Sequence, residues 1–244
     1  RQDMFATQTP EYADDDQIGT DATPAADNFD QTHPLYRHIA SLATLRADHP
    51  ALASGAHVVH DTDGPVFAFS RIDRDERVEY VVLTNSNASL AVPARFSVLS
   101  PDTSFVALRG EAPADLRSDA AGELFVEVPP LGTIVLQAQS ALPPHDRAPL
   151  IGIQRPDDGN TLQTERYRIE AALADRRYAE VTFAISVDGG EPQVIGVDDA
   201  APYRVYWDNS ALPAGATVEI IATVDDGSGA LRSDLVAVTL GDRS

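Results

Sequence analysis

Six histidines are the residues of this sequence best suited to metal binding and to acid–base chemistry. They occupy positions 33, 38, 49, 57, 60 and 145, and no spacing among them matches the HExxH arrangement of a helical zinc site. His57 and His60 fall in a predicted strand, where residues three apart point to opposite faces. The histidine pattern therefore predicts no metal site.

The sequence also lacks the residues that usually act as nucleophiles or bind phosphate. The sequence has no cysteine and no lysine. This excludes disulfides, thiol catalysis, cysteine-based zinc sites, lysine Schiff bases and the lysine of a phosphate-binding loop. No Gly-x-Ser-x-Gly motif marks a serine nucleophile, and no glycine-rich loop follows a predicted strand.

Paired carboxylates are the remaining catalytic candidates. A retaining glycosidase needs two carboxyl groups about 5–5.5 Å apart, one of them kept protonated by its surroundings. The 38 acidic residues will form close pairs by chance, so their number does not indicate such a site. The run Asp14-Asp15-Asp16 offers oxygen ligands for calcium but lacks the alternate spacing of an EF-hand loop, and we interpret it as a solvated acidic run.

The segment Tyr203-Arg204-Val205-Tyr206-Trp207 holds the richest aromatic cluster, and exposed aromatic rings can stack on sugars. Tyr203, Tyr206 and Trp207 are therefore candidate substrate-binding residues, with Tyr178 as a further ring. The alternative is that they are core side chains, because a single tryptophan in a small sandwich usually packs inside. The alternation of a strand predicts that at least part of this set is buried.

The charge balance restricts the partners of the chain. Eighteen basic residues stand against 38 acidic ones, giving a net charge of −20 and a pI of about 4.4. We expect no nucleic acid partner and no anionic membrane partner, because phosphate groups are bound by clustered basic side chains. No run of 18 apolar residues is present, so no spanning helix is predicted. The 244 residues, 43% of them hydrophobic, suit about two folded domains.

One amphipathic helix is predicted, from Pro34 to about Ala47. Its apolar stripe consists of Leu35, Ile39, Leu42 and Leu45. Thr32 or His33 can cap the helix, Pro34 suits the first helical position, and Asp48-His49-Pro50 ends it. The preceding residues 1–32 are polar and acidic, which is typical of a loop or a solvated face.

From residue 55 the hydrophobic period changes to two, which predicts short antiparallel strands. The first group is 57–60, 65–71, 78–84, 90–99, 104–108, 123–128 and 132–138. The second is 150–154, 166–173, 180–188, 192–197, 203–207, 216–224 and 231–240. The apolar run at 78–83 suggests a central strand covered on both sides, and Asp188-Gly189-Gly190 predicts a hairpin turn.

These patterns predict a mainly β protein in which a lone N-terminal helix precedes two antiparallel β-sandwich domains. Residues 55–139 form the first sandwich and residues 150–244 the second, which we expect to be immunoglobulin-like without its cystine. Between them, residues 140–149 form a proline-rich linker, which we expect to be short and stiff. A lone helix cannot bury its stripe by itself, so it packs on the following domain or belongs with a partner outside this sequence.

Two stretches together resemble the C-terminal part of an α-amylase-type glycoside hydrolase of family 13. The first is Arg1-Gln2-Asp3-Met4-Phe5 with Tyr12-Ala13-Asp14-Asp15-Asp16 and Asp27-Asn28-Phe29-Asp30. The second is His33-Pro34-Leu35-Tyr36-Arg37 with Leu42-Ala43-Thr44-Leu45-Arg46 and His49-Pro50-Ala51-Leu52 before Gly55. The resemblance covers residues 1–140, and residues 150–241 resemble a bacterial Ig-like module.

The resemblance implies that residues 1–54 are the barrel-end loop and last helix of a (β/α)₈ barrel, a remnant here. It also implies that the nucleophilic Asp, the acid Glu and the stabilising Asp lie upstream of Arg1, so no catalytic residue can be assigned. Asp27, Asn28 and Phe29 become candidates to line an outer sugar subsite in the parent, unless they only shape the loop. The family also implies secretion and no cofactor in this chain, and it leaves open whether the parent requires calcium.

Three functions follow as hypotheses. The first is a non-catalytic region whose partner is the missing catalytic barrel of a parent that hydrolyses α-1,4-glucans. The second is a binding module that holds α-glucan near the parent's active site, which requires at least two coplanar aromatic rings in solvent. The third retains enzymatic activity through an unrecognised carboxylate pair in a deep pocket with a raised carboxyl pKa.

Overall fold

The computed structural model describes residues 5–27, 29–143 and 145–242 of the chain. Its backbone divides into two compact units, Arg1–Ala53 and Ser54–Ser244. Among the described residues, helix α1 (Pro34–Asp48) lies in the first unit, and every strand lies in the second, where the strands form two β-sandwiches. The predicted mainly β fold is confirmed.

The N-terminal unit contains a short 3₁₀ turn, Pro10–Tyr12, and helix α1, Pro34–Asp48, which confirms the predicted helix. The cap is His33, whose Nδ1 accepts a hydrogen bond from the backbone N–H of Leu35 at 3.1 Å. At the other end the N–H of His49 donates to the carbonyl of Leu45. No residue of α1 is buried, and Ile39 on its apolar stripe is 65% exposed. A one-turn helix, α2 (Ala51–Ser54), follows.

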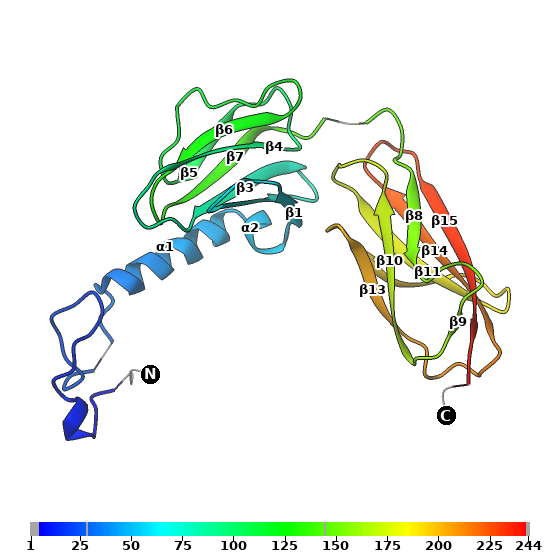
Figure 1. The fold of residues 1–244 in the computed structure, drawn as a ribbon, viewed down its shortest axis with the longest axis horizontal. Helices are drawn as coiled ribbons and strands as arrows, with labels where there is room; N and C mark the ends of the chain where they lie inside the picture. Colours follow the sequence, from blue (N-terminus) through cyan, green and yellow to red (C-terminus); the bar gives the residue numbers. More distant parts are fainter. Residues whose placement is uncertain (1–4, 28, 144, 243–244) are drawn as a thin grey trace. The chain divides into compact units, whose positions relative to one another are not determined.

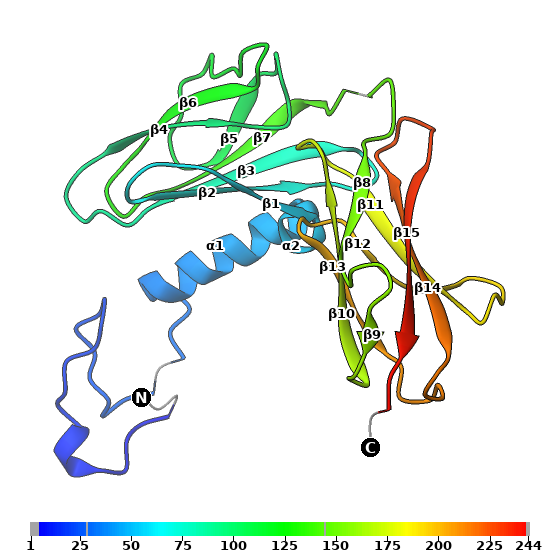
Figure 2. The ribbon, with the colours of Figure 1, turned by 45° about the vertical axis from the view of Figure 1, so that its right-hand side comes forward.

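The first sandwich is built from seven strands in two sheets. The strands are β1 (Ala56–His60), β2 (Val66–Ile72), β3 (Val78–Asn85), β4 (Val92–Ser97), β5 (Phe105–Arg109), β6 (Glu123–Val128) and β7 (Thr133–Ala141). One sheet has the order β1-β2-β3-β7-β5 and the other pairs β4 with β6, all antiparallel (Figure 2). Each predicted strand of this domain has its counterpart.

Alternation sets the two faces of the five-stranded sheet. Val66, Ala68 and Ile72 of β2 are buried, whereas Phe67 between them is exposed. Strand β3 is central, and three consecutive residues, Glu79 to Val81, are buried, as expected for a strand covered on both sides. The burial of a carboxylate at Glu79 was not predicted.

Within residues 145–242, the described part of the second sandwich, there are eight strands. They are β8 (Ile151–Arg155), β9 (Thr161–Leu162), β10 (Arg166–Leu173), β11 (Glu180–Val187), β12 (Gln193–Asp198), β13 (Tyr203–Asp208), β14 (Thr217–Asp225) and β15 (Arg232–Leu240). The sheets have the orders β13-β10-β8 (Figure 1) and β12-β11-β14-β15-β9 (Figure 2). Strand β9, which pairs parallel to β15, was not predicted because two residues carry no periodicity.

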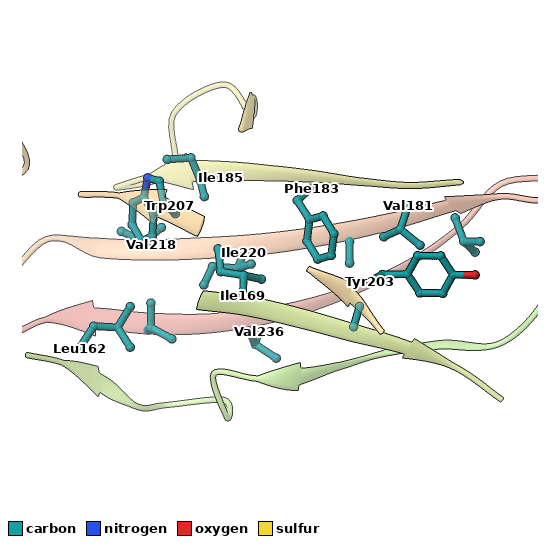
Figure 3. Close-up of a cluster of buried hydrophobic side chains, with 14 of the residues drawn as sticks. Leu162, Ile169, Val181, Phe183, Ile185, Tyr203, Trp207, Val218, Ile220 and Val236 are labelled. Atoms are coloured by element: carbon teal, nitrogen blue, oxygen red, sulfur yellow. The ribbon is translucent and has the colours of Figure 1, made fainter. Parts of the chain in front are cut away.

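The core of the second sandwich is almost wholly apolar (Figure 3). Phe183 of β11 and Ile220 of β14 are fully buried between the sheets, together with Ile169 of β10. The predicted hairpin joins β11 to β12, where Asp188 and Gly189 adopt positive φ angles of 49° and 76°. The Gly190 N–H closes this turn on the carbonyl of Val187 at 2.9 Å.

Candidate functional site

The predicted aromatic candidates of β13 divide between the core and the surface. Tyr203 and Trp207 are buried among the apolar side chains of the second sandwich (Figure 3), and Tyr178 is buried as well. Burial raises the pKa of the Tyr203 hydroxyl, as do the nearby Asp198 and Asp199. Buried rings cannot stack on a sugar, so this strand offers no surface made of both Tyr203 and Trp207.

Tyr206 is the member of this set that faces solvent, with 59% of its surface exposed. The Arg166 guanidinium lies over its ring at 5.9 Å from the centroid, and Arg168 is its partner across the β10–β13 ladder. Alternation accounts for this division, because Tyr206 points away from the core that Tyr203 and Trp207 enter. One exposed ring falls short of the coplanar pair that stacking on a glucan requires.

The loop candidates lie in the N-terminal unit. Asp27 and Phe29 are both exposed, and Asp27 Oδ1 accepts a hydrogen bond from the Phe29 N–H at 3.3 Å. The Phe29 ring meets Phe5 edge to face with centroids 5.3 Å apart. Asn28 lies outside the described residues. These contacts shape the loop locally, and a role in a sugar subsite stays a prediction.

Three buried polar side chains inside the first sandwich form the main cluster that the sequence analysis missed. His60 of β1, Ser70 of β2 and Glu79 of β3 lie on adjacent strands, and each is almost completely buried. His60 Nε2 is 2.6 Å from Ser70 Oγ, and the Ser70 hydroxyl donates to Glu79 Oε1 at 2.5 Å. Both oxygens of Glu79 also accept from the Leu99 N–H, at 3.1 and 3.0 Å.

Two signals in the sequence could have found this cluster. Ser70 has the same strand parity as the apolar residues Val66, Ala68 and Ile72, and Glu79 interrupts the apolar run at 78–83. Both patterns place a polar side chain where alternation predicts burial. His57 and His60 do point to opposite faces, since the His57 ring contacts Phe69 whereas His60 enters the core.

The electrostatics of His60 favour a neutral ring. Burial lowers its pKa to about 3, and the positive charge of Arg176 acts in the same direction. Arg176 contacts His60 Nδ1 and donates to the Ser97 carbonyl at 2.9 Å. His60 therefore keeps one proton, which the geometry places on Nε2 facing Ser70.

Ser70 and Glu79 of this cluster lack the access that catalysis needs. Ser70 and Glu79 have no exposed surface, and the serine lies between the histidine and the carboxylate rather than at the open end. A nucleophile must reach its substrate with the base beside it. This arrangement holds protons in fixed positions inside the sandwich.

Two grooves lie near the cluster. One, of about 790 Å³, is lined by residues 59–67 and Ser86. The other, of about 480 Å³, includes Val58, Arg176 and Tyr203 in its lining. The carboxyl groups with shifted pKa values, Asp30, Asp208 and Asp226, lie outside both grooves.

All three of those carboxyl pKa values are lowered. Hydrogen bonds from Thr32 and Ser210 lower those of Asp30 and Asp208. For Asp226, burial would raise the pKa, but hydrogen bonds from Ser228 and Arg177 outweigh it. A general acid of a glycosidase needs the opposite shift.

Within the described residues, no group of three or more histidine, aspartate or glutamate side chains is arranged to hold a metal ion. In the same part of the chain, no helix combines the length and apolar character needed to cross a membrane.

Comparison with known proteins supports the predicted resemblance. No family model matches the sequence. An α-amylase from Streptomyces lividans is 38% identical over 232 residues, which is 94% of this chain and 25% of that protein. An endo-β-1,4-mannanase from Thermotoga petrophila is similar over 40% of this chain and 21% of its own, with 16% identity and a TM-score of 0.30, too low to indicate a common fold. The chain is thus a homologue of about a quarter of an α-amylase, consistent with the predicted C-terminal fragment.

Proposed function

We propose that residues 1–244 are a non-catalytic region of a secreted α-amylase-type enzyme and that their β-domains are stabilising accessory modules. The similarity to the Streptomyces α-amylase carries this proposal, because it extends over 94% of this chain but only 25% of that protein. The parent would hydrolyse α-1,4-glucans with carboxyl groups outside these residues. No cofactor is assigned to this chain, and any calcium requirement belongs to the rest of the parent.

The catalytic barrel of the parent is the proposed partner. Residues 1–54 would be its barrel-end loop and last helix, residues 55–139 its β-sandwich, and residues 150–244 an appended Ig-like module. Helix α1 supports this assignment, since Leu35 and Ile39 of its apolar stripe are exposed. A helix with an exposed stripe normally buries it against another element. The exposed Val59 and Phe67 add a second apolar surface in the first sandwich.

An activity assay tests the non-catalytic role. The chain alone, incubated with soluble starch, should release no reducing sugar above a heat-inactivated sample of the same chain. The full-length parent enzyme is the positive control. Release of more reducing sugar than from the heat-inactivated sample would contradict the proposal. It would favour a catalytic carboxylate pair within residues 1–244.

Glucan binding is a second candidate function, and it rests on Tyr206 as a single exposed ring beside two arginines instead of on a coplanar pair of rings. The ring is exposed and lies among Arg166 and Arg168, whose guanidinium groups can donate to sugar hydroxyls. Co-sedimentation with insoluble starch tests it, comparing the wild type with Tyr206→Ala and with Tyr36→Ala, which removes an exposed tyrosine of α1. Binding that only Tyr206→Ala abolishes would support a glucan-holding module. No binding by the wild type would leave the stabilising role alone.

A further inference from the structure

The hydrogen-bond cluster of the first sandwich does not end at His60. Its last member is Arg176, which lies between β10 and β11 of the second sandwich. The guanidinium contacts His60 of β1 and donates to the carbonyl of Ser97, the last residue of β4. Strands β1 and β4 belong to different sheets of the first sandwich. One side chain from the second sandwich therefore contacts both sheets of the first.

Arg176, His60, Ser70 and Glu79 form a series of hydrogen bonds. The chemistry of these groups fixes the direction of each bond. An arginine only donates, so His60 Nδ1 must accept from it. His60 Nε2 then carries the proton and donates to Ser70 Oγ. The Ser70 hydroxyl is left to donate to Glu79, whose carboxylate only accepts. The series runs from a guanidinium cation to a buried carboxylate without a reversed member.

The unbroken series of hydrogen bonds from Arg176 is important because it ends at a buried carboxylate, Glu79. Glu79 has no exposed surface, and burying an isolated charge is costly unless it is paired and hydrogen-bonded. The described contacts of Glu79 are Ser70, the Leu99 N–H and, at 3.9 Å, the His60 ring. Arg176 supplies a positive charge at the far end of the series, beyond a histidine that burial keeps neutral.

We propose that Arg176 is the positioning residue that completes the buried core of the first sandwich, so that the second sandwich serves as its intramolecular partner. The interface holds the guanidinium, the guanidinium fixes the His60 tautomer, and that tautomer orients Ser70 toward Glu79. This role does not depend on the amylase assignment, because it concerns how the two sandwiches stabilise each other.

Other contacts between the sandwiches are compatible with this role. Arg77 lies over the Tyr178 ring at 5.1 Å from the centroid, and Tyr178 packs in a cluster with Ile72 and Leu142. Arg74 pairs with Glu180 and Asp199, each at 3.1 Å. The Arg74 side chain is 58% exposed, and its pairs contribute little, as is usual for surface ion pairs. Both the Tyr178 cluster and the series from Arg176 to Glu79 reach buried residues of the first sandwich, and the series is the part that reaches Glu79.

A double-mutant cycle between Arg176 and Glu79 tests the proposal. The two side chains belong to different sandwiches and are joined through His60 and Ser70. We would measure the unfolding equilibrium of the full chain for Arg176→Gln, Glu79→Gln and the double variant. Residues without a shared network are additive, whereas members of one network depart from additivity. We expect the unfolding constant of the double variant to depart about tenfold from the product of the single effects.

Glu123→Gln is the matched control, because it makes the same substitution in the first sandwich at an exposed carboxylate paired with Arg95. Its cycle with Arg176→Gln should be additive within about twofold. If Glu79→Gln does not fold, Ser70→Ala replaces it in the cycle, since it interrupts the same series. Additivity for every tested member of the series would overturn the proposal.

Nitrogen NMR of the His60 ring provides a readout that general destabilisation would not change. In the folded wild type at neutral pH, we expect the neutral tautomer with its proton on Nε2. In folded Arg176→Gln, we expect this fixed tautomer to be lost or the ring to titrate at higher pH. Arg176→Lys, which retains a positive donor, should recover part of the wild-type signal. An unchanged His60 spectrum in Arg176→Gln would overturn the role of Arg176.

Discussion

The two sandwiches have similar architecture but different interiors. The second has a core in which Phe183, Val181, Ile220 and their neighbours are apolar and fully buried. The first also has a buried apolar cluster, but in addition it holds His60, Ser70 and Glu79 at buried positions of three adjacent strands. An apolar core depends mainly on volume and shape, whereas a polar core depends on each hydrogen-bond partner being present.

This difference predicts different sensitivities. The second sandwich should lose stability when its buried volume is reduced and should be almost insensitive to pH through its core. The first should respond to the loss of single polar atoms, including those of Arg176 in the other sandwich. The buried polar residues of the second sandwich include Ser186 within β11, and Asn209 and Asp226, which each directly follow a strand.

Phe183→Ala should produce the largest effect, because it leaves a cavity in the centre of the apolar core. We expect a loss of about 3–5 kcal/mol in the free energy of unfolding. Denaturant unfolding followed by the fluorescence of Trp207, the single tryptophan, measures it in the second sandwich. Val194→Ala is the control, because Val194 is exposed and its truncation should cost less than about 0.5 kcal/mol. Equal losses in the free energy of unfolding for the two variants would contradict a central role of Phe183 in the apolar core.

Glu79→Ala should have the next largest effect, on the first sandwich. It leaves the Ser70 hydroxyl and the Leu99 N–H without their acceptor, and each unsatisfied buried group costs about 1–3 kcal/mol. We therefore expect a loss of about 2–4 kcal/mol, measured by calorimetry of the full chain. Glu123→Ala, at an exposed carboxylate, should change stability by less than about 0.5 kcal/mol. A loss for Glu79→Ala no larger than that of the control would mean that the buried carboxylate contributes nothing.

The pH dependence that comes from His60 should be smaller, and it acts on the first sandwich. His60 has a folded pKa of about 3 against an ordinary value near 6.5, so the unfolded chain binds an extra proton between these values. Its contribution is therefore present above pH 6.5 and is lost as the pH falls. Each pH unit within the window changes the free energy of unfolding by up to about 1.4 kcal/mol, or about 2 kcal/mol from pH 6.5 to 5.

His60→Gln checks this sign, because it retains a donor toward Ser70 but does not titrate. Between pH 6.5 and 5, the free energy of unfolding of this variant should change by about 2 kcal/mol less than that of the wild type. The charged and titratable groups acting on His60 are Arg176, Glu79 and His57. His38→Gln, a change on the exposed surface of α1, should leave the wild-type profile intact. Parallel profiles for the wild type and His60→Gln would mean that His60 is not the group responsible.

Tyr206→Ala should have the smallest effect on stability, because its ring is exposed on the second sandwich. We expect a change within about 0.5 kcal/mol, measured by the same Trp207 fluorescence. Trp207→Ala, one residue along the same strand, should cost about 3–5 kcal/mol because its ring is buried. A large loss for Tyr206→Ala would show that the ring supports the fold rather than facing a ligand.

Most of the fold could be predicted from the sequence, since hydrophobic period and turn residues act locally. Helix α1, the hairpin at Asp188-Gly189 and the burial of Tyr203 and Trp207 on one face of β13 all follow from such patterns. The contact between Arg176 and His60 does not, because 116 positions separate them and it depends on how two sandwiches meet. The alternation of the strand indicated that Glu79 would lie on a buried face. It did not indicate which hydrogen-bond donors would stabilise the buried carboxylate.

The exposed apolar stripe of α1 has a consequence for the handling of the isolated chain. The chain carries a net charge of −20, so separate copies repel one another. The Debye length is about 30 Å at an ionic strength of 0.01 M but about 3 Å at 1 M. Concentrated salt removes the repulsion and leaves Leu35 and Ile39 free to self-associate. The isolated chain should therefore remain monodisperse in dilute buffer and form reversible oligomers as the ionic strength rises.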